Sequence, residues 1–421
     1  MLFCKPIRNK SRFKPFREID KTYSFTEYDR ASLVSKVDWE AVVTKESIFL
    51  DLEYLKLVEH STHAVLKCRY VIIYKNKEAC AILYFQLTEF KANVFGDLLH
   101  GEINDIKSHR LKLFEKYVES KDEEDVLFRL FTCGNNLISG EYGFLRTEKI
   151  SKKDFFTLFN TLLKTISSEE SLGSKIAAVL VKDFETPIKE LEDNSKFESF
   201  NVEPNLVVDI PEGLRSLEDY LLLFSKKYRN RAKSILKNRS EFTSKSIELD
   251  EIEKHTERIY SLYHNIYAKA KFKLLLLPHN YFAETKRIFP DRFFMKGFYI
   301  GDELIAFSSW FTMPDKTIEA HYIGMDYELN SKLELYQNIL YSFIELAIET
   351  GKQKVNLGRT AAEIKTTVGA RAHELTCYVQ PQNTLSKLIC KPFIGFLKPK
   401  EWIPRNPFKE DQPAGQAGTL A

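Results

Sequence analysis

The order of strands and helices constrains the fold of this chain most, because one order occurs twice. In the first half, an adjacent pair of apolar, strand-like segments, 66–76 and 79–89, is joined by Asn76, Lys77 and Glu78. A strand at 126–134, a helix at 152–168 and a strand at 176–184 follow. The short polar connection predicts a β-hairpin, and the helix carries apolar residues at helical spacing.

The second half repeats this order without repeating the letters. Helices are expected at 216–239 and 250–270, strands within 296–313 and at 317–327, a helix from about 332 to 350, and strands at 354–358 and 375–380. Ser331 and Glu334 have capping-box spacing, and Gly351 fits the end of that helix. Helices alternating with adjacent strands predict an α/β (α+β) fold class, with a mixed, mostly antiparallel sheet flanked by helices in each half.

The length of 421 residues fits two domains of ordinary size. The boundary is expected within 195–205, where the sequence is polar and contains Pro204. We therefore predict a basic, irregular arm at 1–35, a first domain at 36–200, a second domain at 201–384 with the active site, and a basic aromatic tail at 385–421. With 44% hydrophobic residues the chain is not of the disordered class, and no stretch reaches the roughly 18 apolar residues of a membrane span.

The net charge of +3 is the sum of three basic zones and an acidic remainder of the chain. Residues 1–17 carry +6, 224–239 carry +7 without one acid, and 385–409 carry +5, so the rest of the chain carries −15. Such basic zones indicate an anionic partner, which we expect to be a phosphate group, an acidic protein, a nucleic acid or a lipid surface. No DNA-reading motif accompanies them.

The six cysteines are scattered and lie in apolar surroundings, as in KEACAILYF and LTCYV. No pair has the spacing of a metal site or of a disulfide framework. We expect buried thiols in a reducing compartment, and no metal.

The segment with the most specific pattern for a ligand site is KVNLGRTAAEIKTTVGARAHELTCYV, 354–379. A strand ends at Gly358, a turn with Arg359 follows, and a short helix carries Glu363 and Lys365. Loops at the carboxyl ends of strands are common ligand sites in α/β proteins, and a cation there suits an anion. A surface connection with ordinary charges is the alternative.

The pattern LGRTAAEIKTTVGA, with EAHYIGMDYELN and LYQNILYSFIELAIETG before it, resembles the carboxyl half of the Fem-related tandem GNAT acyltransferases. FSKKYRNRAKSILKN is similar to the basic helix that opens their second domain, and FTCGNNLISGEYGF is similar to a motif in their first. This resemblance implies two GNAT-like domains and an N-acyltransferase. The glycine loop that holds the pyrophosphate of acetyl-CoA in GNAT enzymes is absent from DYELNSKLE, 326–334, so acetyl-CoA is not the expected donor.

The resemblance also places the oxyanion contact on the central strand, IEAHYIG. We expect His321 and Tyr322 to lie on opposite faces of this strand, so that at most one faces the site. His321 is the first candidate for a base, since its ordinary pKa is near neutrality, and Tyr322 and Glu363 follow. Arg359, Lys365 and Tyr336 are candidates for holding the donor. The alternatives are a half-buried histidine and core packing of the tyrosine.

A helix over 217–239 would place Lys226, Arg229, Lys233 and Lys237 on one face, with Lys227 and Arg231 beside them. We expect Lys227, Arg229 and Arg231 to bind phosphate or a carrier protein. The tail interleaves rings with cations, which suits a lipid headgroup layer, or it wraps the domain and packs its rings.

Together these features predict a transferase that moves an acyl group from a thioester, acyl-CoA or acyl-carrier protein, to an amine of an amino acid, an aminolipid or a cell-envelope precursor. No tightly bound cofactor is expected. The alternatives are a Fem-like aminoacyltransferase that uses aminoacyl-tRNA, and a binding module for carrier protein or lipid. The expected location is the cytoplasm or the surface of the inner membrane.

Overall fold

The structure is a computed structural model. It describes residues 13–44, 47–62, 66–91, 116, 119–122, 125–168, 172, 176–269, 275–382, 386–387, 394–395, 398–399 and 401–409. The chain forms two compact units, the first from Met1–Phe200 with Thr376–Phe396 and the second from Asn201–Leu375 with Leu397–Ala421. The domain limits predicted above run to residue 384 for the second domain, whereas here the chain re-enters the first unit at Thr376.

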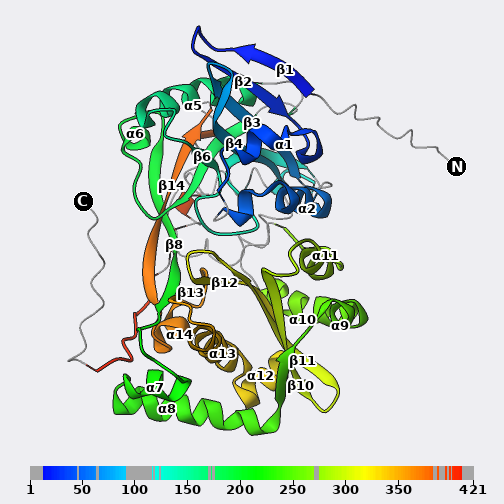
Figure 1. The fold of residues 1–421 in the computed structure, drawn as a ribbon, viewed down its shortest axis with the longest axis vertical. Helices are drawn as coiled ribbons and strands as arrows, with labels where there is room; N and C mark the ends of the chain where they lie inside the picture. Colours follow the sequence, from blue (N-terminus) through cyan, green and yellow to red (C-terminus); the bar gives the residue numbers. More distant parts are fainter. Residues whose placement is uncertain are drawn as a thin grey trace, which may run out of the picture. The chain divides into compact units, whose positions relative to one another are not determined.

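The first unit is a mixed sheet with helices, in the strand order β1-β2-β3-β4-β5-β7-β14, and β6 pairs with β4 (Figure 1). Its strands are β1 (Phe13–Glu18), β2 (Tyr23–Tyr28), β3 (Leu66–Lys75), β4 (Glu78–Lys91), β5 (Val126–Cys133), β6 (Phe144–Arg146), β7 (Ile176–Phe184) and the end of β14 (Arg371–Pro381). Its helices are α1 (Lys36–Glu40), α2 (Leu52–Thr62), α5 (Lys152–Ser167) and α6 (Lys189–Glu192).

Local sequence explains the best predicted elements of this unit. The β3–β4 hairpin turns at Asn76 and Lys77, both in the left-handed region with φ of 49° and 70°. Helix α5 begins after Ser151, whose Oγ accepts from the Asp154 amide at 3.1 Å, and it buries Phe155. The predicted hairpin and this helix are confirmed.

One expectation for this unit is wrong. Residues 13–28 are not irregular, because they form β1 and β2, and β2 pairs with β3 along its whole length. The expectation of a basic arm came from the cations of residues 1–17, whereas YSFTEY alternates apolar and polar residues as a strand does, and its six residues are all buried. The sequence also predicts an amphipathic helix over 107–121, which lies outside the described part of the chain apart from residues 116 and 119–121. Residues 1–12 of the arm lie outside it as well.

The second unit has the strand order β8-β13-β12-β11-β10-β9. Its strands are β8 (Glu198–Asp209), β9 (Thr243–Ser246), β10 (Phe293–Ile300), β11 (Glu303–Thr312), β12 (Thr317–Met325) and β13 (Lys354–Asn356). Its helices are α7 (Leu217–Leu222), α8 (Lys226–Lys237), α9 (Leu249–Lys254), α10 (Thr256–Lys269), α11 (Tyr281–Ile288), α12 (Tyr327–Leu333), α13 (Leu335–Glu349) and α14 (Ala362–Thr367). The β12–β13 pair is parallel, and the other pairs of this unit are antiparallel.

Helices cover both faces of β12. Ile318 and Met325 belong to one apolar cluster with the buried side chains of α13 and α7. On the other face, a Cβ placed on Gly324 would meet the backbone of Leu262 and Tyr263 in α10 at 2.7 Å, so this strand and α10 approach closely. Figure 1 shows α13 and α10 on opposite sides of the strands. The mixed, mostly antiparallel sheets flanked by helices confirm the predicted fold class.

Two predicted helices have other bounds than expected. The expected helix at 216–239 stops at Leu222 because Phe224 forms a β-bridge with Phe408, and α8 starts only after Ser225. The helix expected at 332–350 is α13, which starts at Leu335 because Glu334 is left-handed with φ of 52°. The capping box is therefore wrong: the Tyr336 amide is capped by Asn330 Oδ1 at 2.8 Å instead. Gly351, with φ of 64°, follows the end of α13 as predicted.

In the part of the chain that the structure describes, no helix has the length and apolarity to cross a membrane.

Candidate functional site

A fork between two parallel strands marks the centre of the second unit. β12 pairs with β13 only over Thr317–Glu319, and β12 then continues beside β11 to Met325. The chain after β13 instead follows β8, since the Leu357 amide donates to the Leu206 carbonyl at 2.8 Å. Strands that separate in this way leave main-chain groups between them and open the sheet at their carboxyl ends, where ligands bind in α/β folds.

A β-bulge lies on β12 directly beyond the fork. Trp310 pairs with Ala320 and Ser308 with Ile323, so Ser309 alone faces two residues, His321 and Tyr322. The Ser309 hydroxyl accepts from the Tyr322 amide at 3.1 Å and donates to the Tyr322 carbonyl at 2.7 Å. A side chain thus replaces the ladder bonds that the extra residue interrupts.

The bulge overturns the expectation that His321 and Tyr322 lie on opposite faces. Their ring centroids are 4.4 Å apart, and both rings contact that of Tyr281 in α11. The strict alternation of a strand fails at a bulge, where consecutive side chains turn to the same face. Other rings of the cluster are Tyr263, Phe282, Phe293 and Phe311.

Burial sets the protonation of this cluster. The Tyr281 hydroxyl and His321 Nε2 are 2.8 Å apart, in a hydrogen bond whose donor depends on the histidine tautomer. Burial lowers the pKa of His321 to about 3, and burial raises the pKa of Tyr322 well above its ordinary value. Both rings are therefore neutral at pH 7, and the imidazole is a hydrogen-bonding group with little affinity for a proton.

The turn after β13 is held by Lys365. Its buried ammonium donates to three carbonyls of this turn, those of Leu357, Gly358 and Arg359, at 2.8, 3.2 and 2.5 Å. Burial lowers the pKa of Lys365 to about 7. These contacts use the donors of the ammonium on the main chain, so Lys365 shapes the turn that carries the half-buried Arg359. An anion-holding role for either residue stays a prediction.

Glu363 in α14 holds the carboxyl-terminal segment. Its carboxylate pairs with Arg405 at 3.3 Å and accepts from the Ile403 amide at 3.3 Å, and the Arg405 amide donates to Thr366 Oγ1. Further along, the Phe408 ring packs on Phe224. We call residues 401–409 the strap. This part of the predicted tail packs its rings on the domain, as one of the two sequence interpretations proposed.

Two hollows lie on either side of α14. The first, the α8–α14 cavity, has a volume of about 240 Å³ and is lined by residues of α8, α13, α14 and the strap: Tyr228, Arg231, Ile235, Gln337, Tyr341, Glu363, Ile364, Thr367 and Arg405. It brings together Arg231 and Glu363, which are far apart in the sequence. The second has about 310 Å³ and lies between β8, the turn after β13 and the strap, with Glu203, Glu363 and Glu401 as its charged residues.

The remaining predicted residues lie at the cavity, on the surface or against the apolar cluster. Arg231 lines the α8–α14 cavity and pairs with Glu334, Lys227 is exposed, and Arg229 is half-buried on α8. Tyr336 packs against the apolar cluster of the second unit, and burial raises its pKa. The structure thus places none of these side chains in the ring cluster of His321, and their roles stay predictions.

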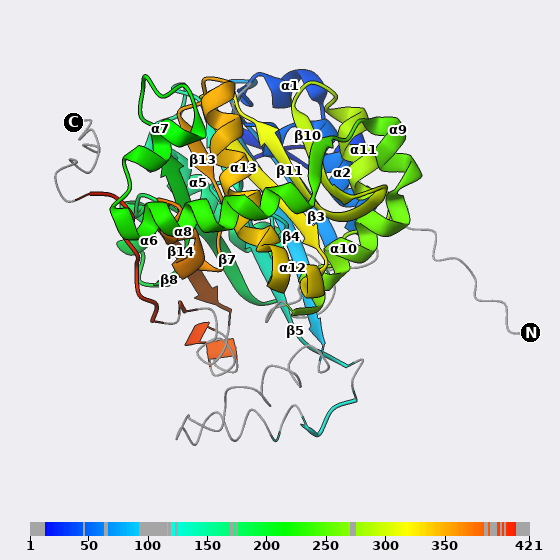
Figure 2. The ribbon, with the colours of Figure 1, turned by 90° about the horizontal axis from the view of Figure 1, so that it is seen from below.

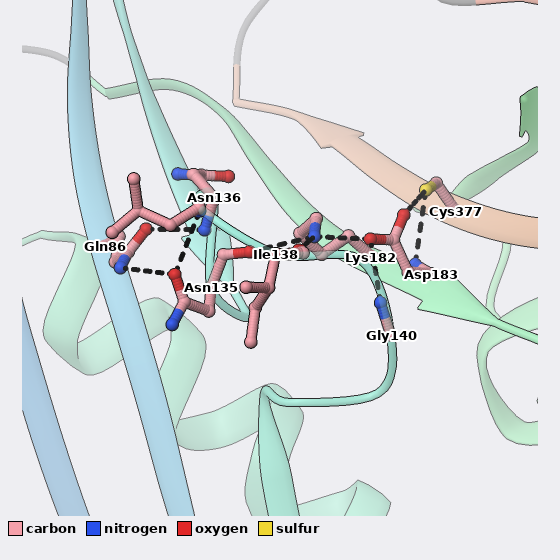
Figure 3. A network of polar contacts seen from close by, with 9 residues as sticks. Gln86, Asn135, Asn136, Ile138, Gly140, Lys182, Asp183 and Cys377 are labelled. Atoms are coloured by element: carbon pink, nitrogen blue, oxygen red, sulfur yellow. Dashed lines mark hydrogen bonds and ion pairs between the residues drawn. The ribbon is translucent and has the colours of Figure 1, made fainter. Parts of the chain in front are cut away.

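The first unit has no comparable fork among its described residues. The parallel strands β5 and β7 stay paired from Arg129–Ile176 to Cys133–Val181. Beyond them, Lys182 Nζ donates to the carbonyls of Asn135 and Ile138 at 2.9 and 2.8 Å and pairs with Asp183, which accepts from the Gly140 amide. Figure 3 shows this network, which ties the loop after β5 to the end of β7 and extends to Gln86 and Cys377.

No group of metal-binding side chains occurs within the described ranges. Cys68, Cys80, Cys133 and Cys377 are free and buried, which confirms the predicted state of these four thiols. Cys4 and Cys390 lie outside the described residues.

Sequence reasoning missed the residues that organise the site. Ser309 and Tyr281 were not singled out, Glu334 was noted only for its capping-box spacing, and Arg405 only as one charge of the tail. The signal available for Glu334 was the absence of glycine in DYELNSKLE, which leaves the chain's own side chains beside the start of α13. For Ser309 and Tyr281, no local pattern in the sequence shows the contact.

Comparisons with known proteins find similarity only at the level of structure. No family model matches the sequence, and no curated protein matches it. Among solved structures, FemX is 9% identical, with 85% of this chain and 98% of that chain covered and a TM-score of 0.49. L-PGS from Bacillus licheniformis is 11% identical over 76% and 87% of the two chains, with a TM-score of 0.44. A GCN5-related N-acetyltransferase from Sphaerobacter thermophilus is 9% identical over 75% and 82%, with a TM-score of 0.38.

Proposed function

We propose that the second unit transfers an acyl group from a thioester to an amine. The fork between β12 and β13, with the bulge at His321 and Tyr322 directly beyond it, is the observation that supports this proposal. An acyl carbonyl that enters such a fork meets main-chain amides, which stabilise the oxyanion that forms when the amine attacks. The C–N bond forms as the C–S bond breaks, the amine gives up its proton, and the leaving thiolate takes one.

The ring cluster on the α10 and α11 side of β12 is the wall of the proposed acceptor site. Since His321 is neutral and its pKa is about 3, it does not act as a strong base at neutral pH. We assign to it a positioning role, in which Tyr281 fixes the orientation of the imidazole through the 2.8 Å hydrogen bond. The proton of the attacking amine then leaves to solvent.

A transfer assay with three donor classes tests the proposal. The purified chain is offered a mixture of amines with a long-chain acyl-CoA, an acyl-carrier protein or aminoacyl-tRNA, and N-acylated products are identified by mass spectrometry. We expect product from a thioester, and a loss of about tenfold or more in kcat for Tyr281→Phe, which removes the hydroxyl that bonds the imidazole at Nε2. Tyr299→Phe is the matched control, because the buried Tyr299 hydroxyl has no hydrogen-bond partner among the described residues.

The other outcomes identify the alternatives. Product with aminoacyl-tRNA alone would establish the Fem-like aminoacyl transfer. No product with any donor, together with retained binding of carrier protein or lipid, would show a binding module on the same fold. Equal rates for the Tyr281 and Tyr299 variants would remove the ring cluster from the reaction.

A further inference from the structure

The outward side of α8 is a row of cations. Its exposed residues are Lys226, Lys227, Asn230, Arg231, Lys233, Ser234 and Lys237. Figure 2 shows α8 along its whole length at the outside of the second unit. Within the described part of the chain, Lys226, Lys227 and Lys237 form no ion pair, and the nearest acid to Lys233 is at 3.9 Å. We call these four side chains the lysine row. A helix that carries this charge without one acidic residue presents a strong, one-signed field to a partner.

The same helix lines a cavity on its other side. Tyr228, Arg231 and Ile235 form one wall of the α8–α14 cavity, whose volume is about 240 Å³. Arg405 of the strap lies at the same cavity. A partner bound to the lysine row would therefore have an opening for a slender, phosphate-bearing group across the width of α8. The guanidinium groups of Arg231 and Arg405 line this opening, each paired with a carboxylate, that of Glu334 and that of Glu363.

The start of α13 is poorly suited to a pyrophosphate. Helix starts ordinarily bind phosphates through their free amides. Here Asn330 Oδ1 already accepts from the Tyr336 amide at 2.8 Å, and the carboxylate of Glu334, the residue before the helix, pairs with Arg231 and accepts from Asn238 Nδ2 at 3.5 Å. Asn330 Oδ1 thus takes one amide at the helix start, and a carboxylate side chain belongs to the residue directly before the helix, which disfavours a free nucleotide thioester as donor.

We propose that an acidic acyl carrier protein docks on the lysine row and passes its phosphopantetheine arm into the α8–α14 cavity. The inference names the donor of the proposed acyl transfer and rests on that function. An acidic protein complements a row of lysines, and its arm carries a single phosphodiester in place of a pyrophosphate. After transfer the released thiol stays on the carrier protein.

Two other anionic partners fit the row less well. Single-stranded nucleic acid is bound by stacking bases on aromatic rings, and the exposed positions of α8 carry no ring. A membrane-surface helix buries its apolar side in lipid, whereas the apolar side of α8, with Ala232 and Ile235, is packed in the domain core.

Fluorescence anisotropy of a labelled acidic carrier protein in its holo form tests the docking, with the full-length chain as titrant. We expect saturable binding at low salt that weakens steeply between about 50 and 500 mM salt. The variant Lys226→Glu, Lys227→Glu, Lys237→Glu should weaken it by roughly tenfold or more, because all three charges face the partner. The matched control reverses three exposed lysines outside α8, Lys153→Glu, Lys254→Glu and Lys354→Glu, and should bind as the natural chain does.

Four results would overturn the proposal. They are no binding of the holo carrier protein, equal binding by the two triple variants, equal affinity for the holo and apo forms, and tighter binding of bulk tRNA or phosphatidylglycerol vesicles than of the carrier protein. Binding is measured without turnover, so the two proposals fail separately. If the carrier protein docks as expected but no thioester yields product, the docking surface stands and the proposed reaction fails.

Discussion

Ser309 and Tyr322 exchange two hydrogen bonds across the bulge of β12, since one hydroxyl both accepts from the Tyr322 amide and donates to its carbonyl. Ser309 is completely buried. The bulge is what turns His321 and Tyr322 to one side of the sheet, so the geometry of the ring cluster depends on a side chain of the neighbouring strand.

Ser309→Ala should therefore lower the free energy of unfolding by about 2–3 kcal/mol, because it removes the hydroxyl that bonds the part-buried amide and carbonyl of Tyr322. Ser308→Ala is the control on the adjacent position, where the buried hydroxyl has no partner among the described residues and its loss should cost little. Chemical denaturation of both variants measures the difference. Equal losses would mean that the two bonds contribute nothing to stability.

The contrast between these serines shows where sequence-based prediction stops. The β3–β4 hairpin, α5 and β12 follow from local patterns, and all are present. The bulge does not follow from a local pattern, because strand alternation assumes regular pairing with the neighbouring strand. The extra residue of β12 lies opposite Ser309, which belongs to that neighbouring strand. Tyr281 is 40 positions from His321, and Glu334 is 103 positions from Arg231.

The predicted bounds of the helix at 216–239 were wrong for a similar reason. The pattern over 216–239 is continuous for a helix, but Phe224 forms a β-bridge with Phe408, which lies in the segment predicted as a basic aromatic tail. Local propensity favours one long helix, and a tertiary contact divides it into α7 and α8. The basic character of α8 was visible in the sequence. The cavity on its other side was not, since three further segments form it.

The half-buried imidazole of His321 should make stability depend on pH in the acid range. Its pKa is about 3 in the folded protein and near 6.5 in the unfolded chain, so the unfolded chain binds more protons below pH 6.5. The free energy of unfolding therefore falls as the pH drops from about 6.5 towards 3, by about 2 kcal/mol at pH 5 from this group at most. His321→Gln should remove this part of the slope in denaturation curves measured between the two pH values. His264→Gln, at an exposed position, is the control and should leave the slope unchanged.

The glycine after α14 should be irreplaceable. Gly369 has φ of 101°, and a Cβ there would lie 2.2 Å from the Tyr220 hydroxyl and 2.8 Å from the Phe408 ring. Gly369→Ala should cost about 3 kcal/mol or more and loosen the strap, which limited proteolysis within 401–409 would detect. Gly213 has φ of 85° with no atom within 4 Å of such a Cβ, so Gly213→Ala should cost only about 1 kcal/mol. Similar costs for both would show that the strap adapts to the added methyl group.

The Lys182–Asp183 pair should hold the loop after β5 in the first unit. Both side chains are buried, and Asp183 is left-handed with φ of 67°. Lys182→Met keeps the length of the side chain but leaves a buried carboxylate without its cation and two loop carbonyls without their donor, so we expect a loss of about 3–4 kcal/mol. Hydrogen exchange at the Gly140 amide, which donates to Asp183, should accelerate in the same variant. Lys153→Met, at an exposed position of α5, is the matched control. An unchanged exchange rate at Gly140 would show that the loop keeps its place without the pair, and that β5 and β7 stay together through their ladder bonds alone.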